Sequence, residues 1–203
     1  TAAQFLALLE ASLRPADALR LDPAVRDALL TRLRAALEGA VPGSSVCLRG
    51  SLAEGRADAY SDIDLLWEVP DEAFEGAVKR IGEALSRAQP VESLRSEPDF
   101  QRSDRRRLFF VQFRGMPLFW RADIDVLARS LGGDLSYDAK NPTARGGDWS
   151  RTHSALMNAI AAVKALLRGE EEKARGLLDR GYARVGLPTP EVDLRAQIVQ
   201  LAE

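Results

Sequence analysis

Two aspartates separated by one residue, Asp62 and Asp64, are the side chains of this sequence best placed to do chemistry. They lie in an apolar stretch that predicts a β-strand. Alternate residues of a strand point to the same face, so the two carboxylates should lie roughly 6.5 Å apart on one side of it. Neighbouring negative charges are costly unless cations compensate them. Pairs of divalent ions held in this way serve phosphoryl-transfer chemistry, and the spacing predicts such a metal site.

A glycine and a serine, Gly50 and Ser51, follow a short strand predicted at 45–49. Glycine lets the backbone approach a ligand closely, and the amide groups that follow can point at phosphate oxygens. Ser51 adds a hydroxyl donor. The pair therefore predicts a corner that holds phosphate groups beside the two carboxylates.

A third carboxylate to complete the site has two candidates, Asp123 and Asp125, in a strand predicted at 118–126. The two share one face of that strand, while Ile124 and Val126 share the other. An acidic pair among apolar residues would be unusual in a plain buried strand. Either aspartate can supply the third ligand on this reasoning.

The chain contains one cysteine, Cys47, and one histidine, His153. These counts exclude an internal disulfide and a zinc site that needs several histidines or cysteines. Carboxylates must then hold a catalytic metal, which favours a hard cation such as magnesium. Cys47 is expected to be a buried thiol, because Val46 and Leu48 flank it in a predicted strand.

The overall charge argues against a general attraction to nucleic acid. Lys and Arg total 28 and Asp and Glu total 30, which gives a formal net charge of -2. Only 6% of the residues are aromatic, so a platform for stacking bases is poorly supplied. Nucleic acid is therefore not the expected partner. The sequence has no apolar run of about 20 residues and no signal-peptide pattern at 1–14, so we expect a cytoplasmic protein without a membrane partner.

Hydrophobic periodicity predicts a mixed α+β body followed by helices. The body has helices at 22–39 and 71–88 and strands at 45–49, 62–69, 91–95, 107–113 and 118–126. Asp22 can cap the first helix, whose apolar stripe begins at Val25, and Ser150 or Thr152 can cap the first helix after the body. The last two strands form a predicted hairpin through the turn at 114–117. We therefore expect a catalytic domain over 1–128, a connecting loop over 129–150 and a helical region over 151–203.

Gly50-Ser51, Ser61 and Asp62-Ile63-Asp64 together resemble the signature of the polymerase-beta-like nucleotidyltransferase superfamily. The resemblance covers residues 45–126 and is closest to bacterial aminoglycoside-adenylyltransferase-like enzymes and minimal nucleotidyltransferases. It implies the nucleotidyltransferase fold, a mixed twisted sheet flanked by helices, with a small helical unit after it. In that family a third acidic residue comes from a later strand, and Asp123 fits its position better than Asp125.

The resemblance also implies an activity. Asp62, Asp64 and Asp123 would hold two Mg²⁺ ions, Gly50 and Ser51 would hold the terminal phosphates, and Lys164 would reach the triphosphate unless it is only a helix lysine that extends to solvent. The enzyme would move a nucleoside monophosphate from a nucleoside triphosphate, ATP, to a hydroxyl of a small molecule such as an aminoglycoside. The alternatives are a protein or RNA acceptor, as in toxin–antitoxin-type minimal nucleotidyltransferases, and a nucleotide-binding module without catalysis. The oligomeric state stays open.

Overall fold

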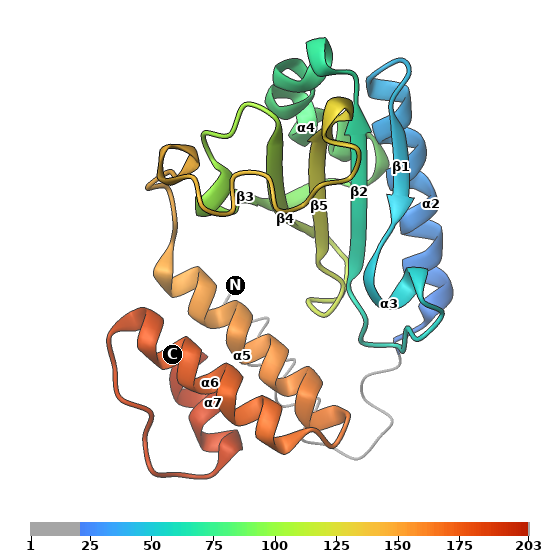
Figure 1. Ribbon diagram of the computed structural model, residues 1–203. Helices are drawn as coiled ribbons and strands as arrows, with labels where there is room; N and C mark the ends of the chain where they lie inside the picture. The colour runs from blue at the N-terminus through green and yellow to red at the C-terminus, as the bar shows by residue number, and fades with distance from the viewer. Residues whose placement is uncertain (1–20, 203) are drawn as a thin grey trace. The chain divides into compact units, whose positions relative to one another are not determined.

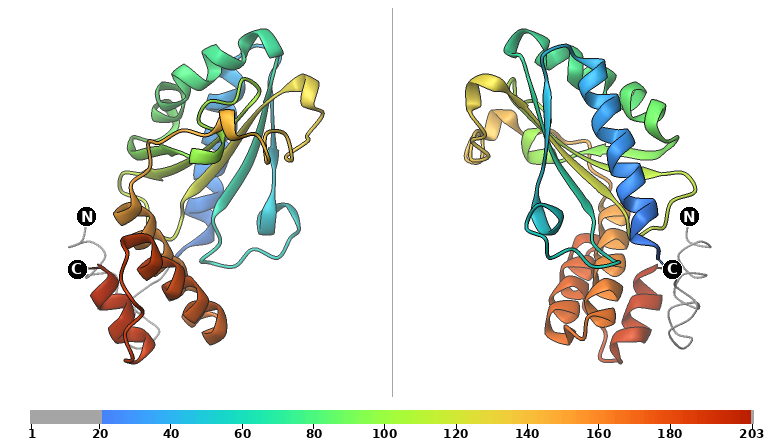
Figure 2. Two further views of the ribbon diagram at one scale, coloured as in Figure 1. Left: turned by 60° about the vertical axis from the view of Figure 1, so that its left-hand side comes forward. Right: turned by 90° about the vertical axis from the view of Figure 1, so that its right-hand side faces the viewer.

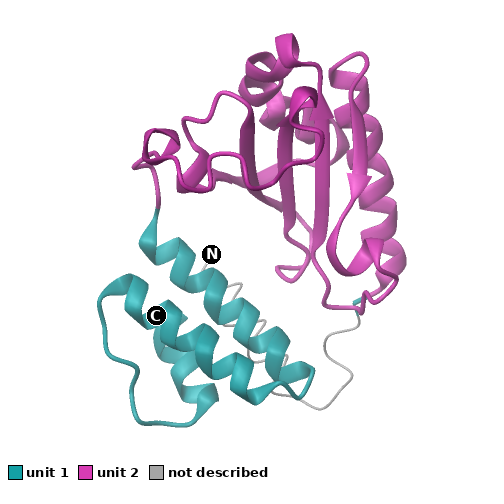
Figure 3. Ribbon diagram, viewed as in Figure 1, with its two compact units in different colours: residues 1–21, 150–203 teal, residues 22–149 magenta. Residues whose placement is uncertain are grey.

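The computed structural model describes residues 21–202. The start of the predicted domain 1–128 and the segment 1–14 lie outside these residues. The chain divides into two compact units, one of residues 22–149 and one to which the helices after residue 149 belong (Figure 3).

The larger unit is built on a sheet that has five strands within the described residues, in the order β1-β2-β5-β4-β3 (Figure 1). β2 and β5 run parallel, and every other neighbouring pair runs antiparallel. This mixed sheet confirms the predicted fold class. The strands are β1 Ser45–Leu48, β2 Ile63–Val69, β3 Val91–Ser96, β4 Arg106–Phe113 and β5 Ala122–Ala128.

Two helices, α2 (Pro23–Ala40) and α4 (Phe74–Ala88), cover one face of this sheet (Figures 1 and 2). A short 3-10 turn, η1 (Asp71–Ala73), leads into α4. The helices pack on the residues of β2 that alternate toward them, which are all buried: Ile63, Leu65, Trp67 and Val69. Because strand residues alternate between faces, Asp64 points to the face that α2 and α4 do not cover.

The start of α2 agrees with the sequence prediction except for its apolar stripe. Asp22 caps the helix, and its Oδ1 accepts a hydrogen bond from Ala24 N at 2.9 Å. Val25, predicted to begin the buried stripe, is 42% exposed. Arg26 is buried in its place, and its Nη1 donates to the Asp58 carbonyl at 2.6 Å.

Two further expectations need correction. β5 begins at Ala122 rather than at residue 118, so the predicted hairpin of β4 and β5 is present but its connection is longer than 114–117. Cys47 is exposed rather than buried. It lies in β1, an edge strand, and points to the opposite side from buried Val46.

The segment 129–149 passes over the face of the sheet opposite α2 and α4 (Figures 1 and 2). It contains two 3-10 turns, η3 (Arg129–Leu131) and η4 (Pro142–Ala144). Backbone hydrogen bonds of 2.8 Å tie its second half to the segment around η2 (Pro98–Phe100), from Arg102 N to the Ala144 carbonyl and from Gly146 N to the Pro98 carbonyl. The approach needs a glycine, because a Cβ at position 146 would fall 2.6 Å from Gln101 Cβ.

The helical unit contains α5 (Arg151–Leu167), α6 (Glu171–Val185) and α7 (Leu194–Ala202). Ser150 caps α5 as predicted, and its Oγ accepts a hydrogen bond from His153 N at 3.1 Å. Tyr182 Oη donates to the Gln197 carbonyl at 2.7 Å, which joins α6 to α7. Across the part of the chain that the structure describes, no helix combines the length and apolar character needed to cross a membrane.

Candidate active site

Three aspartates lie on the face of the sheet that α2 and α4 leave uncovered. Asp64 and Asp123 are partners in the parallel register of β2 and β5, so their side chains point the same way. Asp62 lies immediately before β2, and its Oδ1 accepts a hydrogen bond from Arg121 N at 3.2 Å. The structure thus places three of the four aspartates singled out in the sequence on one face, and their roles as metal ligands stay a prediction.

Gly50 lies against the Asp64 carboxylate. It begins α3 (Gly50–Ala53), a single helical turn directly after β1, with a positive φ of 58°. A Cβ at this position would fall 3.1 Å from Asp64 Cγ and closer still to Oδ2. Asp64 therefore occupies space that any side chain at position 50 would need. Ser51 follows in the same turn.

The segment that leads from α3 to β2 is fixed by internal hydrogen bonds. Ser61 Oγ donates to Asp58 Oδ1 at 2.9 Å, and Arg26 holds the Asp58 carbonyl from α2. Trp120 Nε1 donates to the Ala59 carbonyl at 2.8 Å from the segment before β5. These bonds set where the chain enters β2. Arg26 and Trp120 act through contacts between distant segments, and no pattern in the sequence indicates these contacts.

A guanidinium group lies among the three carboxylates. Arg121 Nε and Nη2 donate to the two oxygens of Asp123 at 2.5 and 2.6 Å. Burial raises the pKa of Asp123 to about 6; Asp62 and Asp64 act in the same direction and Arg121 opposes them. Burial alone would lower the pKa of Arg121, but the three carboxylates outweigh burial and raise it. The site therefore concentrates negative charge that Arg121 partly neutralises. The role of Arg121 could have been inferred from its position two residues before Asp123.

Asp125, the other candidate for the third carboxylate, is held in a buried ion pair. Arg106 Nε and Nη2 donate to its two oxygens at 3.0 and 2.9 Å. Arg106 also lies over the Phe100 ring, with Cζ 3.9 Å from the ring centroid, and donates to the Leu135 carbonyl. In the register of β2 and β5, Asp125 lies beside Leu66 rather than beside Asp64. The geometry therefore favours Asp123.

The carboxylates fit a divalent cation by their chemistry, although they are not gathered around one point. Within residues 21–202, no group of three or more His, Cys, Asp or Glu is arranged to hold a metal ion. Both oxygens of Asp123 are bonded to Arg121 in this arrangement. Oxygen ligands on one face, one of them against a glycine, suit a hard cation such as Mg²⁺. Burial is the main cause of the raised pKa of Asp123, and the negative charges of Asp62 and Asp64 add to it; a bound cation would offset these charges.

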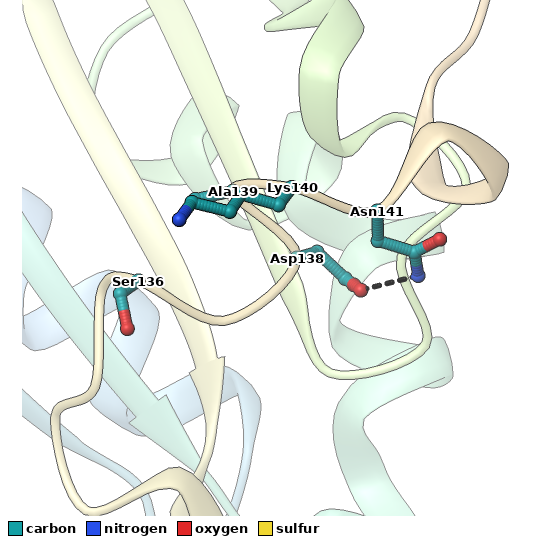
Figure 4. Close-up of a pocket in the computed structure, with 5 residues that line it drawn as sticks. All are labelled: Ser136, Asp138, Ala139, Lys140 and Asn141. Carbon is teal, nitrogen blue, oxygen red and sulfur yellow. Dashed lines mark hydrogen bonds between the residues drawn. The ribbon is translucent and has the colours of Figure 1, made fainter.

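Two other features belong to other segments of the chain. Lys164, predicted to contact the triphosphate, is a buried residue of α5 in the helical unit, so that contact stays a prediction. A pocket of about 540 Å³ follows the segment 129–149 and is lined by Ser136, Asp138, Ala139, Lys140 and Asn141 (Figure 4). A hydrogen bond of 2.6 Å from Asn141 Nδ2 to Asp138 Oδ1 fixes one side of it. None of the three aspartates lines this pocket.

Residues 30–109 match the family model described as the nucleotidyltransferase domain. This stretch of the chain is similar to a nucleotidyltransferase domain. The match supports the nucleotidyltransferase superfamily predicted from the sequence, and it does not extend to the aminoglycoside-adenylyltransferase-like branch. The matched range contains Gly50, Ser51, Asp62 and Asp64, and it ends within β4, before Asp123.

The chain also resembles several solved structures at low identity. A cytoplasmic RNA terminal U-transferase is 19% identical with a TM-score of 0.41, over 70% of this chain and 40% of that one. The Cid1 RNA terminal uridylyl transferase is 17% identical with a TM-score of 0.44, over 81% and 48%. The polymerase core of TRAMP, an RNA surveillance complex, is 11% identical with a TM-score of 0.41, over 99% and 60%. The match thus spans less than two thirds of each of these chains. No curated protein matches the sequence.

Proposed function

We propose that this protein is a nucleotidyltransferase, which moves a nucleoside monophosphate from a nucleoside triphosphate to an acceptor hydroxyl and releases pyrophosphate. The observation that supports the proposal is the pairing of Asp64 with Asp123 across β2 and β5, next to Gly50 and with Asp62 on the same face. Carboxylates on adjacent strands beside a glycine corner suit a reaction that joins a phosphate-rich donor to a hydroxyl.

In the proposed step, the acceptor oxygen attacks the α-phosphorus, a new P–O bond forms, and the bond from that phosphorus to the pyrophosphate oxygen breaks. Two Mg²⁺ ions held by Asp62, Asp64 and Asp123 would neutralise the phosphate charge and activate the acceptor oxygen when bound. Asp123 accepts the proton of the acceptor hydroxyl. With a pKa of about 6, this carboxylate is ionised at neutral pH and therefore ready to act as a base.

Gly50 and Ser51 hold the terminal phosphates in this proposal. The backbone after β1 turns sharply at Gly50, and the amide groups of the turn and the Ser51 hydroxyl are donors suited to phosphate oxygens. Lys164 adds a positive charge for the triphosphate, as the superfamily resemblance implies.

The donor in the proposal is ATP, and the first acceptor to test is a small-molecule hydroxyl such as that of an aminoglycoside. A protein or an RNA is the alternative acceptor. A nucleotide-binding module without catalysis is a further alternative, and the presence of all three carboxylates on one face argues against it.

The test is to incubate the protein with labelled ATP, Mg²⁺ and panels of acceptors, and to measure pyrophosphate release and the mass of the adduct. Asp62→Asn and Asp64→Asn should each lower the rate by about 10²-fold or more. Glu68→Gln is a matched control, because Glu68 lies on the same strand and the same face as Asp64 without contacting the site. We expect it to retain full activity.

Calorimetry with ATP separates the enzyme from the inert module. Binding that depends on Mg²⁺ and is lost in the double variant Asp62→Ala plus Asp64→Ala supports the proposal. Binding that ignores Mg²⁺ and survives both substitutions supports the module without catalysis. A lack of turnover with every nucleotide would reject the enzymatic proposal.

A further inference from the structure

The residue before the glycine corner, Arg49, lies beside Asp64 on the face of the sheet that carries the aspartates. Arg49 N donates to the Asp64 carbonyl at 2.9 Å, which continues the antiparallel pairing of β1 with β2 by one residue. The backbone of Arg49 is extended, with φ -132° and ψ -179°. Residues directly opposite in such a pairing have side chains on the same side of the sheet, with Cβ atoms about 5 Å apart. The Arg49 side chain therefore leaves the backbone next to the Asp64 carboxylate.

The burial of β1 agrees with this placement of Arg49. Val46 is buried in the core that α2 and α4 cover, and Leu48 packs against the same core. Cys47 is exposed on the other side of the strand. Alternate residues of an extended chain point to the same side, so Arg49 shares the uncovered face with Cys47. Arg49 is only partly buried there.

Arg49 and Arg121 differ in how they are already engaged. Arg121 donates to both oxygens of Asp123. Within residues 21–202, the guanidinium group of Arg49 forms no ion pair or hydrogen bond, and none of its nitrogens is fully buried. Since β1 lies on the far side of β2 from β5, Arg49 is on the side of Asp64 away from Asp123. Arg49 can therefore bind an anion there without first giving up a partner.

The aspartates decide when an anion can bind beside Arg49. Without a cation, Asp62 and Asp64 attract the guanidinium group and repel phosphate oxygens. Once bound Mg²⁺ offsets the charge of these carboxylates, the phosphates of a donor are the strongest negative charges left near Arg49. The position of Arg49 therefore suits a polyphosphate that arrives together with Mg²⁺.

We infer that Arg49 binds the β- and γ-phosphates of the donor, on the side of Asp64 away from Asp123. The inference rests on the proposed function, in which Gly50 and Ser51 hold these phosphates. Arg49 directly precedes Gly50, and a guanidinium group presents paired N–H donors that match phosphate oxygens. The α-phosphate lies nearer Asp123, which accepts the proton of the acceptor. Arg49 therefore distinguishes a triphosphate from a monophosphate.

The test measures the Kd of ATP, AMP and pyrophosphate by calorimetry at saturating Mg²⁺. Arg49→Gln should weaken ATP and pyrophosphate about tenfold and leave AMP within about twofold. Arg87→Gln is the matched control, because Arg87 is an exposed arginine of α4 that pairs with Glu83 on the covered side of the sheet (Figure 2). It removes the same charge and should change none of the three values.

Metal binding without nucleotide separates a phosphate contact from damage to the site. Arg49→Gln removes a positive charge beside Asp64, so the affinity for Mg²⁺ alone should stay the same or increase. A variant whose site had collapsed would lose affinity for Mg²⁺ and for ATP together. Arg49→Lys keeps the charge but loses the paired donors, so it should restore part of the ATP affinity.

The outcomes separate this inference from the proposed function. If ATP binds with Mg²⁺ and Arg49→Gln leaves its Kd within about twofold, or weakens AMP as much as ATP, Arg49 does not bind the terminal phosphates and the proposed function stands. If Arg49→Gln weakens Mg²⁺ alone as much as ATP, Arg49 has a structural role and the inference is wrong. If the unaltered protein binds neither ATP nor pyrophosphate, the proposed function fails and this inference fails with it.

Discussion

Replacing Gly50 with alanine tests whether the turn after β1 leaves the Asp64 carboxylate room for its proposed role. The backbone at Gly50 has φ 58°, and a residue with a Cβ costs about 1 kcal/mol in this left-handed conformation. The added Cβ would also fall 3.1 Å from Asp64 Cγ and closer to Oδ2, so the carboxylate must move aside. A displacement of about 1 Å in an active site costs about 10²-fold in rate, or about 2.7 kcal/mol of transition-state stabilisation.

Gly55→Ala is the matched control for this substitution. Gly55 also has a positive φ, 67°, but nothing lies within 4 Å of the place its Cβ would take. Both variants should therefore lose about 1–2 kcal/mol of unfolding free energy in urea titrations. Only Gly50→Ala should lose about 10²-fold in the initial rate of pyrophosphate release at saturating ATP and Mg²⁺.

A double-mutant cycle tests whether the effect of Gly50→Ala depends on the Asp64 carboxylate. In an Asp64→Ala background, Gly50→Ala should cost little further activity, because the carboxylate it displaces is gone. Equal rates for Gly50→Ala and Gly55→Ala would refute the argument. They would show that the close approach of Gly50 to Asp64 has no part in the reaction.

Three further predictions concern charged groups. Burial, together with Asp62 and Asp64, raises the pKa of Asp123 to about 6, so protons should compete with Mg²⁺ for this carboxylate below pH 6. The Mg²⁺ affinity measured by calorimetry should fall about tenfold for each pH unit below 6 and level off above it. Arg106→Met should lower the unfolding free energy in urea by about 3–5 kcal/mol because Asp125 is left buried without its partner, and adding Asp125→Leu should recover most of the loss. Lys164→Gln should raise the Kd of ATP if Lys164 contacts the triphosphate; an unchanged Kd in calorimetry would remove it from the site.

The alternation of residues in single strands was enough to predict the faces of the sheet. Asp62 and Asp64 were expected on one side of their strand. β2 begins at Ile63, and from there its buried residues alternate with Asp64 on the other side. Their distance from Asp123 could not be predicted in the same way. It depends on the parallel pairing of β2 with β5, and β3, α4 and β4 lie between these strands in the chain. The superfamily resemblance, rather than any local pattern, led to Asp123.

The contacts missed by the sequence analysis join segments that are far apart in the chain. Arg26 is buried where a helical stripe predicted Val25, because its guanidinium reaches the Asp58 carbonyl. The segment 129–149 has no apolar periodicity, yet backbone hydrogen bonds to the neighbourhood of η2 give it a defined path. Backbone bonds of this kind leave no pattern in residue types, apart from the glycine required at position 146.

The two Arg–Asp pairs on the uncovered face differ in solvent exposure, and this difference bears on which aspartate can serve as a metal ligand. In the pair of Arg106 with Asp125, the side chains are 8% and 10% exposed, and breaking such a buried pair costs about 3–5 kcal/mol. In the pair of Arg121 with Asp123, they are 25% and 20% exposed, so solvent offsets more of the cost of separating them. A carboxylate that must exchange an arginine for a cation during a reaction cycle has to belong to the pair that separates at lower cost. Since Asp123 also lies in register with Asp64, it rather than Asp125 is the carboxylate suited to serve as the third ligand.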